Sequence, residues 1–420
     1  MNIELYKAAI VSGIAVGGTY ALVAVGITQI FSVTRVLNFA HAGFTLWGAY
    51  LYAQFTYEWG WPVGWSAILT IAIVGVMGLA SEMLVFRYAS RATPVNRIIL
   101  TFGLFLLLAA VAARIWGFEV KAAVPLFPGG SFSVLGTNVS WQQLANLCAV
   151  LLVVVGMGAF LRFTRLGLQT RAMAEDNTIA EMMAISKSRI GLLNWGLAAM
   201  VGGMAGVLAA SLQPFTGPVF LQYFLIALTA TLVGGLRSLW LTAVGGLAIG
   251  VILSVTQVAS STIGMGTLVV FLGVVALVLL RKHWPSELSK IGWSRPQISG
   301  PNPGWMVARF VLLAGWLWMI IAIYRTDFWG LTGALVLVYT VAVFSLVPLI
   351  GWTGQVSLAQ GGFMAIGALA MNEVYTYHQM PMAVAVLVAI LAGALGGALV
   401  GLICYRLSFV QTAIVTLAFT

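Results

Sequence analysis

Two short segments of the sequence place amide, imidazole and hydroxyl side chains inside apolar runs that are rich in small residues. The first contains Asn38, His41 and Thr45, and the second contains Ser357 and Gln360. At membrane depth such groups can hydrogen-bond where lipid cannot, so they are candidates to line the path of a polar solute. They could equally hold neighbouring helices together, and the residue types leave both roles open.

The two segments are copies of one another. Residues 37–44 align with residues 356–363 at a constant offset of 319, and the same offset pairs Pro62 with Pro381. An even number of predicted spans separates the copies, so we expect them to cross the membrane in the same direction. Parallel repeats are typical of a pseudo-dimeric pore or transporter, whereas inverted repeats mark many secondary carriers.

A polar loop, residues 162–189, is the second place where function can be located. Thr178 and Glu181 have the spacing of a capping box, which predicts a short helix that opens at Thr178. An apolar strip at helical spacing follows on this helix. An exposed strip indicates docking into a groove of a soluble partner, or else a helix that lies on the membrane surface. The strip consists of Ile179, Met182 and Met183.

Catalytic and metal-binding patterns are missing from the sequence. There is no phosphate loop that ends in Gly-Lys-Ser/Thr, so ATP would be used by separate subunits and this chain needs no cofactor. His41, His283 and His378 fall in three different predicted segments and predict no metal site. No carboxylate lies at the centre of a predicted span, which argues against an ion-coupled mechanism. We therefore expect a chain that is not an enzyme.

The composition excludes a water-soluble domain. The chain has 420 residues, of which 61% are hydrophobic and 7% are charged, whereas roughly a quarter are charged in soluble domains. Apolar runs of about twenty residues predict membrane-spanning helices. We expect an all-α polytopic membrane protein with about 13 to 14 transmembrane or re-entrant helices in two parallel pseudo-repeats. The predicted spans lie near residues 8–33, 38–57, 63–86, 98–118, 142–161, 190–212, 220–236, 239–257, 263–280, 305–324, 329–350, 357–376, 382–405 and from 410 onward.

Charge and proline content predict the orientation and the domains. Alternate threading places sixteen of the twenty Lys and Arg residues on one side, so the positive-inside rule puts the N-terminus outside. The net charge of +10 therefore reflects topology, and no nucleic-acid partner is expected. Residues 281–304 are a polar, proline-rich linker, expected in the cytoplasm, between domains 1–280 and 305–420.

The chain resembles the permeases of the branched-chain amino-acid ABC transporters. Three stretches carry the resemblance: Val36–Ala42, Arg171–Ile185 and Gly351–Gly361. Residues up to about 285 resemble one permease subunit, and residues from about 305 resemble the N-terminal part of its companion. The resemblance implies a fusion of the two permeases with an incomplete second domain, in the cell inner membrane.

The resemblance also implies partners and roles. Two cytoplasmic ATPase subunits would drive the pore, and a periplasmic or surface-tethered binding protein would deliver a branched-chain amino acid or a related solute such as urea or a short amide. An ion-coupled carrier or a passive channel is the alternative. Ala184 departs from the family, which usually has glycine there, and Arg237, Trp240 and Leu241 also depart. The expected ATPase-coupling segment contains Arg171, Ala174, Asp176, Ala180 and Ile185, with Glu175 and Ile179 of the same loop.

Overall fold

The computed structural model describes residues 3–91, 94–134, 137–260, 262, 264–280, 303–323, 327–352, 357–405 and 407, together with 412, 413, 415, 416 and 419. The chain divides into two compact units, Met1–Lys282 and His283–Thr420. Among the described residues, seven helices are long and apolar enough to cross a membrane, and shorter apolar helices accompany them. The predicted class, an all-α polytopic membrane protein, is confirmed.

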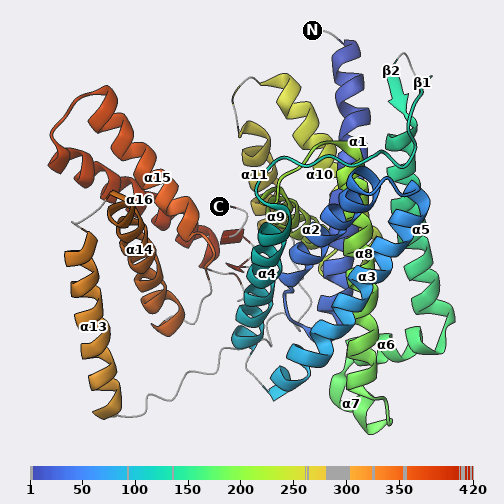
Figure 1. Cartoon of the computed structure of the whole chain (residues 1–420), viewed down its shortest axis with the longest axis horizontal. Coiled ribbons are helices and arrows are strands. Elements are labelled where there is room, and N and C mark those ends of the chain that lie inside the picture. Colours follow the sequence, from blue (N-terminus) through green and yellow to red (C-terminus); the bar gives the residue numbers. More distant parts are fainter. Residues whose placement is uncertain are drawn as a thin grey trace. The chain divides into compact units, whose positions relative to one another are not determined.

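Unit 1 is a helical bundle (Figure 1). Its principal elements are α1 (Ile3–Thr34), α2 (Ala40–Ala53), α3 (Val63–Ser81), α4 (Pro94–Trp116), β1 (Ser131–Val134), β2 (Thr137–Ser140), α5 (Trp141–Phe163), α6 (Arg165–Glu175), α7 (Asn177–Met182), α8 (Lys187–Leu212), α9 (Val219–Val233), α10 (Leu239–Ala259) and α11 (Met265–Leu280). The start of α1 and the hairpin of β1 and β2 lie at one end of the unit, and α6 and α7 lie at the other.

Two helices form the centre of unit 1. In the most apolar window of α1 and α8, 72% and 78% of the residues are buried, against about a fifth in the windows that cover α3, α4 and α5. α1 packs mainly on α10, and α8 packs on α2, α3 and α1. The outer helices leave apolar side chains exposed, as helices that face lipid do.

Glycines let the central helices touch backbone to backbone. A Cβ atom added to Gly17 would lie 2.9 Å from Leu247 Cα of α10, and one added to Gly13 would lie 2.7 Å from Val251 Cα. A Cβ added to Gly48 of α2 would lie 2.8 Å from Gly203 Cα of α8. Small residues permit such close crossings in membrane bundles, so glycine spacing in these helices reflects packing.

A short hairpin that the sequence did not predict lies between α4 and α5. β1 and β2 pair antiparallel, with Ser131 opposite Ser140 and Val134 opposite Thr137. Ser140 then caps α5, since its hydroxyl accepts from Gln143 N at 3.2 Å and its own N–H donates to Gln143 Oε1 at 3.0 Å. β1, Ser-Phe-Ser-Val, alternates polar and apolar residues over only four positions, which is at the lower limit of a recognisable strand signal.

Unit 2 repeats the α2–α3 hairpin of unit 1. It contains α13 (Pro303–Ile323), α14 (Asp327–Leu346), α15 (Gln360–Asn372) and α16 (Met382–Cys404). The π-helical segment Gln54–Glu58 after α2 recurs as Glu373–Tyr377 after α15, at the offset of 319. Pro62 and Pro381 then cap α3 and α16 in the same way. The two sequence copies therefore share one local structure.

Some predictions about organisation fall on residues that are not described. Of the predicted linker 281–304, residues 281–302 lie outside the described residues. The helix α13 begins at Pro303. Most of the span predicted from residue 410 is also outside the described residues. The domain boundaries and the parallel direction of the two repeats stay predictions.

Candidate functional site

The polar segment before α2 stabilises a break between two helices. α1 ends at Thr34, and Arg35 has a φ of 55°, which turns the chain. Asn38 Oδ1 accepts from Ala40 N at 3.1 Å, at the start of α2. Phe39 N donates to Thr101 Oγ1 of α4 at 3.2 Å. These contacts supply partners for backbone N–H groups that lipid could not satisfy.

Unit 2 makes the same break with different residues. Ser357 Oγ accepts from Ala359 N at 3.2 Å, and Leu358 N donates to Thr416 Oγ1 at 3.0 Å. Ser357 and Leu358 correspond to Asn38 and Phe39 at the offset of 319. The predicted polar positions thus have a structural role in both units, which the sequence alone left open.

His41 and Thr45 are packed inside unit 1. The His41 ring fits against two glycines, since a Cβ on Gly202 would lie 3.0 Å from His41 Cε1 and a Cβ on Gly26 would also clash with the ring. Thr45 Oγ1 donates to His41 O at 3.1 Å, one turn back in the same helix. Both side chains are fully or almost fully buried.

Gln360 occupies the position of His41 in unit 2. Its Nε2 donates to Ser345 Oγ of α14 at 3.4 Å, and Ser345 corresponds to Gly26. Ser357 and Gln360 both line a cavity of about 680 Å³ between α14, α15 and α16. The structure therefore brings these two predicted residues to an open space. A solute path through any of the five predicted residues stays a prediction.

A cavity of about 260 Å³ in unit 1 is bordered both by Asn38 and by residues of the loop after α5. Its wall includes Met173 of α6 and Lys187 at the start of α8. Glu82, Arg87 and Arg97 supply charged groups, and Phe86 and Trp195 supply apolar surface; their rings stack with centroids 4.2 Å apart. Neither His41 nor Thr45 borders this cavity. Asn38 is thus the predicted pathway residue that lies beside the predicted coupling segment.

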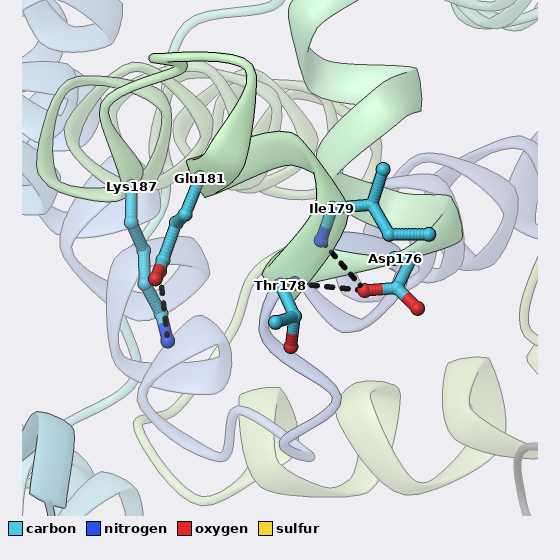
Figure 2. Close-up of polar contacts among 5 residues, drawn as sticks. All are labelled: Asp176, Thr178, Ile179, Glu181 and Lys187. Atoms are coloured by element: carbon cyan, nitrogen blue, oxygen red, sulfur yellow. Dashed lines mark hydrogen bonds and ion pairs between the residues drawn. The ribbon is translucent and has the colours of Figure 1, made fainter.

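The predicted ATPase-coupling segment lies on two short helices, α6 and α7, and the predicted capping box is wrong. Asp176 lies between α6 and α7 in an extended conformation, and its Oδ1 accepts from Thr178 N at 2.8 Å and from Ile179 N at 3.0 Å (Figure 2). Asp176 is therefore the N-cap, and Thr178 lies inside the helix. Glu181 is 3.8 Å from Lys187 Nζ and so pairs across the turn to α8. The carboxylate that precedes Thr178 takes the cap, because it accepts both N–H groups at once.

One side of this loop faces outward and carries the apolar strip. Ile179, Met182 and Met183 are 57%, 81% and 70% exposed. Arg171 and Glu175 are exposed at the same end of the unit. Three neighbouring apolar side chains at such exposure form an apolar patch, which is compatible with docking to a partner and with a helix on the membrane surface.

The other side anchors the loop to the bundle. Met173 and Ala180 are buried in a cluster with Val33 of α1 and Ile190 of α8, and Ile185 packs against it. Arg35 donates a hydrogen bond to Ala174 O. Sequence reasoning missed Arg35 and Met173 as anchors, because their partners lie more than a hundred residues away or on another helix.

The backbone at Ala184 shows why glycine is the expected residue at this position. Its φ is 61°, in the left-handed region that favours glycine. The turn between α7 and α8 keeps this conformation although the side chain opposes it. Gly235, with a φ of 61°, and Leu236, with a φ of 59°, form a similar turn before α10, close to the departure at Arg237.

The chain is similar to known transport proteins. A family model described as the permease component of the branched-chain amino acid transport system matches residues 9–280. The high-affinity branched-chain amino acid transport system permease protein LivH of Escherichia coli K12 is 25% identical over 264 residues, which is 60% of this chain and 86% of LivH. BraD of Pseudomonas aeruginosa, a protein of the same description, is 27% identical over 274 residues, 59% of this chain and 84% of BraD. A probable LivH of Methanocaldococcus jannaschii is 26% identical over 271 residues, 62% of this chain and 84% of its own length. No solved structure matches the chain.

Proposed function

The chain belongs to the family of permease components of branched-chain amino acid transport systems, and from this premise we propose that it is the membrane-spanning part of an ABC importer. The solute is a branched-chain amino acid or a related small polar molecule, such as urea or a short amide. The observation that carries the proposal is the exposed apolar strip on α7, a helix whose first turn is capped by Asp176.

The motor in this proposal is a pair of separate ATPase subunits in the cytoplasm. The sequence contains no phosphate loop, so ATP is bound and hydrolysed on the partners, and this chain needs no cofactor. α7 enters a groove of one ATPase with Ile179 and Met182, in the manner of an amphipathic helix bound to a groove. The end of unit 1 that carries α6 and α7 then faces the cytoplasm, and the N-terminus faces outside.

Contacts of the loop provide a route from the ATPase to the pore. Arg35 contacts the backbone of Ala174 in α6, and Arg35 lies in the break that leads to Asn38. A shift of α6 and α7 therefore acts on the start of α2 through direct contacts. Coupling of this kind needs an element with two arrangements, and the helix break before α2 is the proposed element.

The remaining parts of the transporter follow the same logic. A periplasmic or surface-tethered protein binds the solute and delivers it to the outer face, and membrane lipid surrounds the exposed helices. Unit 2 belongs to a second permease domain, and Ser357 and Gln360 serve the solute path there as Asn38, His41 and Thr45 serve it in unit 1. Alternating access would move this path between the two faces of the membrane.

Uptake into vesicles tests the proposal. The purified chain is reconstituted with candidate ATPase and binding-protein subunits, and labelled leucine is offered with and without ATP. We expect uptake that requires ATP, and the joint change of Ile179 and Met182 to serine should reduce it about tenfold. The matched control is Leu168→Ser on α6, which alters a side chain of similar exposure, 59% against 57% for Ile179.

Three results would count against this function. Uptake without ATP would indicate a passive channel. Uptake that collapses when a proton or sodium gradient is dissipated would indicate an ion-coupled carrier. Equal loss in the strip variant and in the Leu168 control would remove the docking role of α7.

A further inference from the structure

A second cavity of about 260 Å³ lies at the end of unit 1 that carries α6. Its described lining residues differ throughout from those of the cavity beside Asn38. α1 ends at Thr34, α5 ends at Phe163 and α10 begins at Leu239, and all three are long and apolar enough to cross a membrane. Residues at these three helix ends and on α6 line the cavity. It therefore lies where membrane-spanning helices meet water, at the level of the lipid headgroups.

Three arginines from separate parts of unit 1 line this cavity. Arg35 follows α1, Arg171 lies on α6 and Arg237 precedes α10. Among the described lining residues Glu175 is the single carboxylate, which leaves a net charge of +2. Arg35 is held at the wall by a hydrogen bond to Ala174 O, while Arg171 and Arg237 are exposed. A guanidinium group forms paired hydrogen bonds with phosphate or carboxylate oxygens, so three of them around one space favour an anion.

The uncharged polar groups of the wall have partners inside the bundle. Gln29 is buried, and its Nε2 donates to Asn194 Oδ1 at 2.5 Å. Thr170 Oγ1 accepts from Asn194 Nδ2 at 3.4 Å. Ser32 Oγ donates to Gln29 O at 2.8 Å. Protein contacts thus hold this part of the wall in place, and the arginines supply the attraction for a ligand.

Residues that adjoin the lining residues in sequence are apolar and exposed. Phe163 follows Leu161 by two positions and is 79% exposed. Trp240 follows Leu239, is also exposed, and packs against α5, since a Cβ atom on Gly158 would lie 3.8 Å from Trp240 Nε1. Tryptophan is enriched at membrane–water interfaces. Exposed apolar surface beside a basic cavity suits a ligand with acyl chains, whereas a small soluble anion would not contact it.

We infer that this cavity binds the phosphate headgroup of an anionic membrane lipid, such as phosphatidylglycerol. The phosphate accepts hydrogen bonds from Arg171 and Arg237, and the acyl chains lie along the exposed surface of α5 and α10. Basic pockets between membrane helices are known binding sites for anionic headgroups. A bound headgroup joins α6 to the turn before α10 and so restrains the helix that leads to α7. The inference requires only that unit 1 spans a membrane, and it is independent of the proposed transport function.

Binding of short-chain lipids tests the inference on the full chain. The chain is purified in a neutral detergent, and titration calorimetry measures its affinity for dihexanoyl phosphatidylglycerol. Dihexanoyl phosphatidylcholine has the same acyl chains and a phosphate but no net charge, and inorganic phosphate has the charge without the chains. We expect phosphatidylglycerol to bind about tenfold more tightly than either of the other two. This comparison uses the parent chain, so it does not depend on the folding of a variant.

Substitutions then locate the binding site. Arg171→Gln and Arg237→Gln each remove one guanidinium group from the cavity and should weaken binding of phosphatidylglycerol about fivefold. The matched control is Arg189→Gln, which removes an exposed arginine near the start of α8 that does not line the cavity and should leave the affinity unchanged.

Four results would overturn the inference. Equal affinity for phosphatidylglycerol and phosphatidylcholine would remove the role of charge. Inorganic phosphate that binds as tightly as phosphatidylglycerol would assign the cavity to a soluble anion. An equal loss in the Arg189 control would indicate attraction by surface charge in general. Unchanged affinity in both the Arg171 and the Arg237 variants would place the lipid elsewhere on the chain.

Discussion

Replacing Asp176 by alanine should loosen the helix that carries the exposed strip. The carboxylate accepts two backbone N–H groups, from Thr178 at 2.8 Å and from Ile179 at 3.0 Å, and alanine accepts neither. Loss of an N-cap costs about 1 kcal/mol, which corresponds to about a fivefold larger opening constant. An asparagine side chain at this position would keep an acceptor oxygen, so Asp176→Asn should change the opening constant much less.

Amide hydrogen exchange measures this effect at the two capped positions. In the alanine variant we expect the amides of Thr178 and Ile179 to exchange about fivefold faster, while amides at the centre of α8 keep their protection. ATP-driven leucine uptake by the reconstituted transporter should fall in the same order, with the asparagine variant close to the parent. If both variants speed exchange equally, the negative charge at the helix start matters and the cap does not. If neither does, the assignment of Asp176 as the cap is refuted.

Three further changes test packing and backbone strain. Gly48→Leu places a side chain against the backbone of α8 and should destabilise unit 1 by about 3 kcal/mol, which lowers the melting temperature in detergent. The control is Gly103→Leu, which has no atom within 4 Å of its Cβ position and should leave the melting temperature unchanged. Asn194→Ala removes the acceptor that Gln29 reaches at 2.5 Å inside the bundle; thermal unfolding should report a loss of about 1 kcal/mol, and unchanged stability would mean that Gln29 finds another partner. Ala184→Gly relieves a φ of 61° and should raise stability by about 0.5–1 kcal/mol, which the same melts would detect as a gain.

Helix positions were predictable from the sequence because lipid imposes a simple rule. A run of about twenty apolar residues must form a helix there, since free backbone groups have no partner in hydrocarbon. The predicted spans 63–86 and 190–212 agree closely with the observed apolar helical stretches Val63–Phe86 and Lys187–Leu212. The repeat was predictable because residue identities, Pro62 and Pro381 among them, recur at one constant offset, and both prolines precede a helix in the structure.

Other features depend on contacts that no local pattern announces. The burial of His41 follows from Gly26 and Gly202, which belong to α1 and α8 and meet the ring only after the bundle forms. The cap of α7 could have been either Asp176 or Thr178 by residue type, and the backbone conformation of Asp176 decides it. The anchoring of the loop by Arg35 likewise joins residues 139 positions apart.

The pairs at positions 26 and 41 and at positions 345 and 360 are two solutions to one steric problem. In unit 1 a full imidazole ring is accommodated because its neighbour, Gly26, has no side chain. In unit 2 a longer but narrower amide leaves space for a hydroxyl on Ser345, which it then uses as an acceptor. Evolution should therefore change the two members of a pair together. Gly26→Ser alone crowds the His41 ring, while Gly26→Ser combined with His41→Gln transplants the second solution into the first copy and should restore the fold.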